Sequence, residues 1–349
     1  MISSFKNDDV MILLKDLSGC ISGMDTDERE KRIQDGVHYS EMLPVEYKPS
    51  DKYIELYSHA LQRFSRKTAW AVCSIAKQIF ERKGEKTVIV SLARAGITTG
   101  ILIKRFIERK YNVNIAHYAI SIIRGRGIDK KAMDYILERH SSADIQFVDG
   151  WIGKGAIAKE LNTALRGLYS NIDNTLAVLA DPPSLAGIRG TREDFLIPSS
   201  CLNAAVSGLL SRTILNESHI GKYDFHGAVF YDNLIPYDRT YEFINTVEKY
   251  FDYNNSDMSS PDICIDMASD IENIQHDFGI TDLNFIKPGI GEATRALLRR
   301  VPWKLLVNSL NDEFYLEHLY QLAKEKNVEV VEYPMNIYRA CGLIKKLDV

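Results

Sequence analysis

Between residues 87 and 181 the chain alternates short apolar runs with segments of helical periodicity, and this alternation constrains the fold more than any other feature. The runs that predict strands are residues 87–92, 115–123, 144–150 and 175–181. The segments that predict helices are residues 99–110, 129–140 and 153–169. Strands alternating with helices predict an α/β fold with a parallel sheet covered on both faces. Ligands of such sheets bind beyond the carboxyl ends of the strands, so each strand–turn–helix junction is a candidate site.

The length of 349 residues exceeds the size at which one core stops growing, so two folded units are expected. Residues 52–82 predict one or two helices, residues 201–215 a helix, residues 227–232 a strand and residues 240–251 a closing helix. The Asn, Ser and Asp residues of 251–262 indicate a linker, and strands and helices alternate again beyond it. We therefore expect domains at 1–250 and 281–349, joined by a linker at 251–280.

Composition excludes several classes of protein. The chain is 45% hydrophobic and 26% charged, and it contains no run of 18 apolar residues and no basic start followed by a long apolar stretch. A cytoplasmic protein with no membrane partner is therefore expected. The five cysteines lie far apart without a CxxC pair, so neither a disulfide framework nor a thiolate zinc site is indicated.

The run from Ile145 to Ile157 is the most informative segment. A buried strand ends in Asp149, and small residues then lead directly into a helix. Glycines permit close approach of the backbone, and the amides at a helix start attract a phosphate, to which Lys154 adds a cation. Asp149 could accept hydrogen bonds from a sugar diol beside that phosphate. A plain strand–helix turn that carries an acid explains the run about equally well.

This run resembles the 5-phosphoribosyl-1-pyrophosphate (PRPP) motif of type I phosphoribosyltransferases. Asp149 matches the first acid of the motif, Trp151-Ile152 the apolar pair and Gly153–Gly155 the 5-phosphate loop, whereas Gly150 replaces the second acid. Residues 91–96 resemble the pyrophosphate loop of the same family, and Arg124 and Arg126 stand where that family has a mobile active-site loop. The resemblance implies a parallel sheet of the type I phosphoribosyltransferase kind.

The resemblance also implies a set of roles. Catalysis would fall to Asp149, Arg124 and Arg126, with Asp149 also contacting Mg²⁺, the implied cofactor. The residues implied to bind PRPP or phosphate are Arg94, Ala95, Gly96, Gly150, Trp151, Ile152, Gly153, Lys154 and Gly155. The acceptor would be a nucleobase-like or other small molecule. The candidates for its pocket are Tyr39, Glu41, Pro198, Ser199, Ser200 and Asn203, although a helix cap at Ser199-Ser200 explains that run about equally well.

Residues 10–250 as a whole resemble the phosphoribosyltransferases encoded with bacterial tellurite-resistance genes, whose relatives have also carried the name StiP-type cysteine protease. A protease requires a thiolate beside a histidine. Cys201 and His226 are the pair that we nominate for that alternative, against the simpler interpretation of Cys201 as a buried structural cysteine.

The C-terminal region resembles the Pelota-type RNA-binding domains, which implies a small α/β sandwich. A strand runs into a basic helix there, and the family's Gly-x-Asn-Glu signature is met at Gly289 and Glu292, with Gly291 in place of the asparagine. Arginines on that helix would supply the salt-dependent part of RNA binding. The residues expected to bind RNA are Lys287, Gly289, Gly291, Glu292, Arg295 and Arg299.

Two main interpretations follow. The first is a PRPP-dependent phosphoribosyltransferase with an RNA-binding C-terminal domain, tied to tellurite or stress resistance. The alternative is a non-catalytic nucleotide- or RNA-binding protein, with the cysteine protease behind it. A homodimer is compatible with both, and the sequence leaves the acceptor and the role of RNA, as substrate or tether, open.

Overall fold

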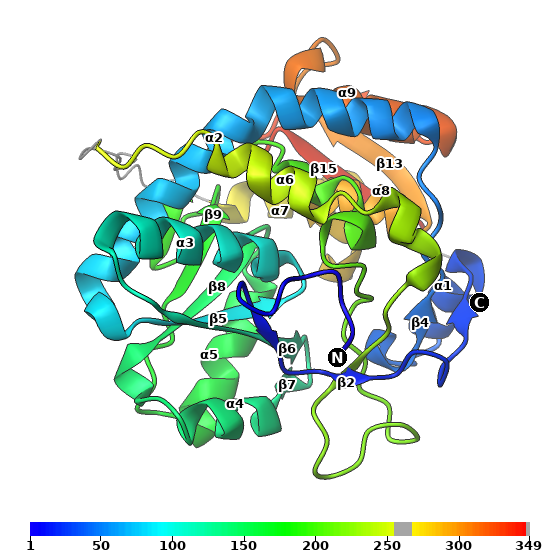
Figure 1. Ribbon diagram of the computed structural model, residues 1–349. Coiled ribbons are helices and arrows are strands. Elements are labelled where there is room, and N and C mark those ends of the chain that lie inside the picture. Colours follow the sequence, from blue (N-terminus) through cyan, green and yellow to red (C-terminus); the bar gives the residue numbers. More distant parts are fainter. Residues whose placement is uncertain (255–266, 347–349) are drawn as a thin grey trace.

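The computed structural model describes residues 1–254 and 267–346, which form two α/β units packed against each other (Figure 1). The first unit contains a seven-stranded sheet in the order β1-β6-β5-β8-β9-β10, with β7 paired to β6. Its strands are β1 (Met11–Ile12), β5 (Val88–Ala93), β6 (Ala116–Ile123), β7 (Gly127–Ile128), β8 (Ile145–Trp151), β9 (Leu176–Ala180) and β10 (Ile188–Thr191). All neighbouring strands in this order are parallel, whereas β7, which lies off this order, pairs antiparallel with β6.

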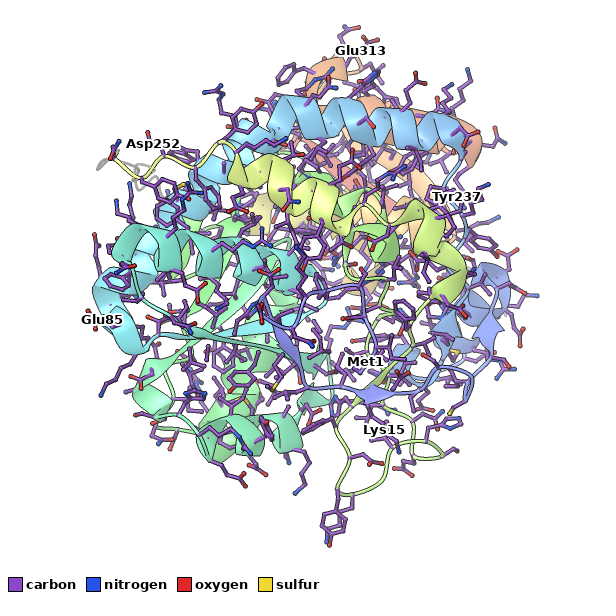
Figure 2. The ribbon with its side chains drawn as sticks, in the orientation of Figure 1. Met1, Lys15, Glu85, Tyr237, Asp252 and Glu313 are labelled. Atoms are coloured by element: carbon purple, nitrogen blue, oxygen red, sulfur yellow. The ribbon has the colours of Figure 1, made fainter. Side chains whose placement is uncertain are left out.

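Helices cover both faces of this sheet, which confirms the predicted mixed α/β architecture. On one face lie α2 (Asp51–Lys83), α3 (Ala95–Tyr111) and α6 (Thr240–Glu248), and on the other α4 (Lys130–Leu137) and α5 (Ala156–Leu168) (Figure 1). The single helix α2 begins where the Ser50 hydroxyl accepts the Tyr53 N–H at 3.2 Å, and it ends at Gly84, whose φ is 68°. Side chains fill the space between helices and sheet throughout (Figure 2).

The second unit is a four-stranded sheet in the order β12-β15-β13-β14, with β13 and β14 parallel and the other pairs antiparallel. Its elements are α7 (Met267–Asp277), β12 (Ile286–Pro288), α8 (Ile290–Arg299), β13 (Pro302–Val307), α9 (Glu313–Glu325), β14 (Glu329–Glu332) and β15 (Ala340–Ile344). Apolar side chains of α8 and α9 join the same hydrophobic cluster as those of α2 and α3. The two units therefore share one core.

Short elements complete the first unit. Helix α1 spans Thr26–Gln34, and there are two small sheets of two strands each, β2 (Lys15–Asp16) with β11 (Gly227–Ala228) and β3 (Gly23–Met24) with β4 (Leu43–Pro44). Helix α1 contributes Glu30, whose carboxylate accepts both Nε and Nη2 of Arg300 at 2.5 and 2.7 Å. This bidentate contact ties α1 to the end of α8.

Some predictions about elements were wrong. Residues 201–215 do not form an α-helix: one 3₁₀ turn, Pro198–Ser200, ends just before the segment, and a second, Asn203–Val206, lies within it and is followed by irregular backbone. Positive φ angles at Asn203 (50°), Gly208 (71°) and Leu209 (57°) interrupt any helical path. Strand β15 was not predicted. Residues 255–266 of the predicted linker lie outside the described residues, and α7 occupies part of the remainder.

Candidate functional site

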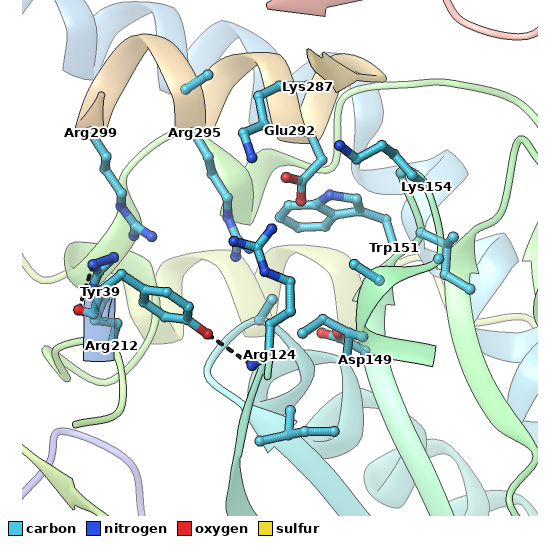
Figure 3. Close-up of a pocket in the computed structure, with 18 of the residues that line it drawn as sticks. Tyr39, Arg124, Asp149, Trp151, Lys154, Arg212, Lys287, Glu292, Arg295 and Arg299 are labelled. Carbon is cyan, nitrogen blue, oxygen red and sulfur yellow. Dashed lines mark hydrogen bonds between the residues drawn. The ribbon is translucent and has the colours of Figure 1, made fainter. Parts of the chain in front are cut away.

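A cavity of about 330 Å³ lies where the carboxyl ends of β5 and β8 face helix α8 of the second unit (Figure 3). The first unit contributes the ends of both strands and the start of α5, and the second contributes side chains of β12 and α8. The predicted residues that line it are Arg94, Ala95, Arg124, Asp149, Trp151, Ile152, Gly153, Lys154, Gly155, Lys287, Glu292, Arg295 and Arg299. Residues assigned to two different functions from the sequence thus meet in one pocket.

The loop between β8 and α5 is held by the second unit. The Lys154 ammonium donates to the carbonyl oxygen of Ile286 at 2.9 Å and to that of Leu283, and the Tyr338 hydroxyl donates to the Gly153 carbonyl at 2.8 Å. A Cβ atom at Gly153 would lie 2.8 Å from the Glu292 side chain. Glycine at this position is required because the second unit packs directly on the loop.

Asp149 stands at the end of β8 among cations. Burial raises the pKa of its carboxyl to about 6, although the N–H of Gly150, which donates at 2.7 Å, and the charge of Arg295 act in the opposite direction. The described residues contain no cluster of three or more His, Cys, Asp or Glu side chains that could hold a metal. Asp149 and Glu292 are the two carboxylates that line this cavity, and they stand among arginines and lysines. This set does not fit Mg²⁺, which prefers several oxygen ligands.

Positive charge dominates the cavity wall. Eight Lys and Arg side chains line it against two carboxylates, Asp149 and Glu292; the cations are Arg94, Arg124, Lys154, Arg212, Lys287, Arg295, Arg299 and Arg300. Burial lowers the pKa of Lys287 to about 7 and that of Arg212 to about 9. So much buried positive charge costs free energy unless an anion balances it.

Several guanidinium groups in this wall lack acceptors. The Nε atoms of Arg212 and Arg295, and both Nε and Nη2 of Arg299, are buried and make no hydrogen bond among the described residues. The Arg295 Cζ atom lies 4.3 Å from the centroid of the Trp151 ring, and Figure 3 shows Arg295 and Arg299 extending from α8 toward the residues of the first unit. An unsatisfied buried donor costs about 1–3 kcal/mol, so these arginines are arranged for an oxygen ligand.

The remaining predicted residues lie outside the wall of the cavity. The Arg126 guanidinium pairs with Glu41 and donates to the Leu215 carbonyl at 3.1 Å. Gly96 and Gly150 allow close backbone packing, since a Cβ at Gly96 would lie 2.4 Å from the Val148 carbonyl oxygen and one at Gly150 3.4 Å from the Ala95 Cβ. In the second unit the two glycines have different roles: Gly289 has a φ of 88°, which favours glycine, and Gly291 packs directly against the Trp151 ring.

Sequence reasoning missed Arg212. It lies in the irregular segment that follows Leu209, donates to the Tyr39 carbonyl at 3.0 Å and has its Cζ atom 4.9 Å from the centroid of the Tyr39 ring. The local sequence carries no periodicity or motif that would have singled it out. A lone arginine in an irregular segment becomes visible only when the fold brings it to the cavity.

The nominated cysteine–histidine pair is not formed. The Cys201 side chain is buried against Tyr53, and burial raises the pKa of its thiol to about 12. The ring of His226 instead bonds the Ser121 hydroxyl, Nδ1 to Oγ at 2.9 Å. No cysteine sulfur in residues 1–254 and 267–346 is hydrogen-bonded to a histidine, and Cys264 lies outside the described residues.

None of the helices in residues 1–254 and 267–346 combines the length and apolar character that a bilayer crossing requires.

Among known families, the model described as "Tellurite-like stress resistance cysteine protease StiP" matches residues 3–248, and the "PELOTA RNA binding domain" matches residues 266–346.

Individual relatives agree with the family matches. A protein of Acinetobacter baylyi described as "Cysteine protease StiP" is 35% identical to this chain, over 99% of this chain and 94% of the relative. Among solved structures, the Helicobacter pylori xanthine-guanine-hypoxanthine phosphoribosyltransferase is 17% identical, covers 34% of this chain and 76% of its own, and has a TM-score of 0.27. A TM-score that low carries no argument about this chain.

These matches overturn the phosphoribosyltransferase interpretation. The sequence predicted a PRPP-dependent transferase from short loops, whereas a relative aligned over nearly the whole chain and a family model over its first 248 residues are both described as a cysteine protease. The predicted enzyme class was therefore wrong, whereas the roles given to individual loop residues stay predictions that no comparison tests. Tellurite-like stress resistance and the Pelota-type C-terminal domain were predicted correctly.

Proposed function

The chain belongs to the StiP family of tellurite-like stress resistance proteins, and we propose that it binds single-stranded RNA in the basic cavity between its two units, the second of which matches the Pelota RNA-binding domain. The observation that carries the proposal is the set of unsatisfied guanidinium donors of Arg212, Arg295 and Arg299 around one cavity. Phosphate oxygens are the acceptors that such forked donors pair with best. The strand backbone would supply these oxygens.

A second feature supports a phosphate ligand. The first turn of α5 begins at Ala156, on the cavity wall, where its free backbone amides and the positive end of the helix dipole add to the arginines. The Pelota family match covers Lys287, Arg295 and Arg299, which lie on the opposite wall. In this proposal both units hold the strand, and the second unit does not bind it alone.

Fluorescence anisotropy with a labelled single-stranded RNA of ten nucleotides tests the proposal. Affinity should fall steeply between 50 and 200 mM salt, because phosphate contacts release counterions, and Arg295→Ala and Arg299→Ala should each weaken binding about tenfold. Arg166→Ala, at the exposed far end of α5, is the matched control and should leave binding unchanged. RNA that binds all three variants equally would place the interface elsewhere, and absence of binding would refute the proposal.

A cysteine peptidase is the second candidate, favoured by the A. baylyi relative described as a cysteine protease. In the described conformation the Cys201 thiol is buried and protonated, so activity would require a rearrangement that exposes a thiol to a histidine. Cys264 is the other thiol to test, since it lies outside the described residues. The two candidates are compatible, because RNA in the cavity could accompany hydrolysis at another site.

Hydrolysis of an unfolded protein substrate by the five single Cys→Ser variants tests this candidate. One variant should lose all activity, and the same cysteine should be alkylated by iodoacetamide in the native protein, as mass spectrometry would show. Cys73→Ser serves as a structural control, since that thiol is buried on α2 and burial raises its pKa to about 11. Equal hydrolysis by all five variants, or none by the wild type, would eliminate the peptidase.

As to architecture, we keep a phosphoribosyltransferase-like arrangement of the first sheet as a proposal about fold alone, supported by the alternation of strands and helices from β5 to β9.

A further inference from the structure

A second cavity of about 640 Å³ adjoins the basic one, and the two share Ile33, Tyr39, Arg124 and Arg300 as a common wall. We call the basic cavity of about 330 Å³ the inner cavity and its neighbour the outer cavity. Both lie between the first unit and the second. The two cavities are therefore neighbours, close enough for two parts of one ligand to occupy them.

The two cavities differ in chemistry. The outer cavity has fewer cations and is lined instead by aromatic and polar side chains, among them His38, Phe285 and Asn284. The rings of His38 and Tyr39 lie with their centroids 4.5 Å apart, and the partly buried Phe285 lines the same cavity. Flat rings and amide groups bind nucleobases by stacking and hydrogen bonding, whereas the inner cavity is suited to phosphate.

The size of the inner cavity limits what can enter. A volume of about 330 Å³ is at the lower end of the range for small-ligand pockets, enough for about one nucleotide. An internal phosphodiester has two covalent arms that must both leave the cavity, whereas a terminal phosphate has one arm and three free oxygens. A terminal phosphate can therefore come closer to the buried, unpaired donors of Arg295 and Arg299 than an internal one.

The net charge of the inner cavity also favours a terminal phosphate. Arg94 faces Glu46 at 3.9 Å and Arg300 is paired with Glu30. Five other cations of the inner cavity, and Lys287 below a pH of about 7, remain against Asp149 and Glu292. A terminal phosphate monoester carries a charge of about −1.5 to −2 at neutral pH, whereas an internal diester carries about one negative charge. The excess of positive charge therefore favours a strand end over a continuous strand.

We propose that the two cavities together recognise the phosphorylated end of an RNA strand, with the terminal phosphate in the inner cavity and the first base in the outer cavity. The proposal rests on the proposed RNA-binding function and adds which part of the RNA is bound. The phosphate contacts Arg295 and Arg299, and the base stacks on Phe285. Because 5′- and 3′-terminal phosphates share this chemistry, the experiment distinguishes them.

The test compares four RNAs of one ten-nucleotide sequence by anisotropy or competition: 5′-phosphorylated, 3′-phosphorylated, unphosphorylated and circular. One of the phosphorylated forms should bind at least tenfold more tightly than the unphosphorylated form, and the circle should bind most weakly. A circle that binds as tightly as the phosphorylated strands would overturn end recognition while leaving RNA binding intact. If none of the four binds, the proposed function itself fails.

Two variants separate the cavities. Phe285→Ala should weaken binding of the preferred phosphorylated RNA several-fold and leave competition by inorganic phosphate unchanged, whereas Arg299→Ala should weaken both. Tyr223→Ala, at a side chain that is 81% exposed and distant from both cavities, is the aromatic control. Thermal melting of each variant checks that it is folded. Equal loss of phosphate and RNA binding in Phe285→Ala would contradict the assignment of the base to the outer cavity.

Discussion

The Arg295 guanidinium of helix α8 stacks on the ring of Trp151 at the end of β8, with 4.3 Å between Cζ and the ring centroid. One residue belongs to the Pelota-matched unit and the other to the StiP-matched unit. The same two residues line the inner cavity. The cavity therefore exists only while the two units are docked, and its chemistry depends on their contact.

This stacking should contribute measurably to stability. In a double-mutant cycle with Arg295→Met and Trp151→Leu, urea unfolding should give a coupling free energy of about 1 kcal/mol, because the pair is largely shielded from water. The exposed pair Lys222 and Tyr223, whose ammonium lies 5.7 Å from the ring centroid, should give a coupling close to zero. Equal coupling in both pairs would mean that shielding does not strengthen the interior contact.

Ligand affinity should rise as the pH falls from 8 to 6. Burial raises the pKa of Asp149 to about 6 and lowers that of Lys287 to about 7, so both groups become more positive over this interval. A more positive cavity binds a phosphorylated strand more tightly. Titration calorimetry on the wild type, Asp149→Asn and Lys287→Met should show each variant losing part of the pH dependence.

The ligand phosphate itself titrates near pH 6 and loses charge at lower pH. That contribution is common to all three proteins and therefore cancels in the comparison. If the affinity of the wild type depends on pH in the same way as that of Asp149→Asn, then binding does not change the protonation of this carboxyl.

Gly291→Ala should weaken the contact between the units. A Cβ atom at this position would lie 2.5 Å from Cε2 of Trp151, and the large ring cannot move without disturbing Arg295. Overpacking of this kind costs about 1–3 kcal/mol, measurable as a lower midpoint of thermal or urea unfolding.

Gly167→Ala is the matched control for this substitution. It lies in α5 with no atom within 4 Å of the new Cβ, so the gain in helix propensity should leave stability unchanged or slightly higher. A lower unfolding midpoint in Gly291→Ala than in Gly167→Ala would attribute the loss to the contact with Trp151, and equal midpoints would contradict it.

Asp194 joins the units through backbone hydrogen bonds. Its Oδ1 accepts the Ile290 N–H at 2.9 Å and its Oδ2 accepts the Arg339 N–H at 2.8 Å. Asp194→Ala would leave both buried donors without acceptors and should lower the free energy of unfolding by about 2–4 kcal/mol. Asp194→Asn retains one carbonyl acceptor and should lose about half as much. If both variants lower the free energy of unfolding equally, the hydrogen bond that Asn retains contributes nothing to stability.

Much of the first unit could be predicted because its signals are local. The alternation from Val88 to Ala180 follows from residue periodicity, and the segment from Asp149 to Gly155 was identified as a candidate site because a buried strand ends in an acid before glycines. Helix α8 was predicted as the basic helix that follows a strand in the second alternation of strands and helices. These elements depend little on the rest of the chain.

The composite cavity could not be predicted, because it depends on docking. Nothing local to Arg295 indicates that it stacks on Trp151, which precedes it by more than a hundred residues, or that Lys154 donates to the Ile286 carbonyl. The enzyme class was predicted wrongly because that prediction, too, rested on short local segments. Glycine-rich turns before helices suit phosphate in many unrelated proteins, so a loop resemblance carried less information than similarity along the whole chain.

Helix α2 has a consequence for the modularity of the chain. Its 33 residues, a rod of about 50 Å, pack on the first sheet along one part and on α9 along another, where Phe64 lies 5.7 Å from the Tyr315 ring. Phe64 is 2% exposed, and its ring packs on Phe195 of the first unit as well as on Phe314 and Tyr315 of the second. Exchanging the C-terminal unit for an unrelated one would remove the latter two rings and uncover part of this apolar side chain. The contact surface on α2 therefore limits which C-terminal units this chain can accept.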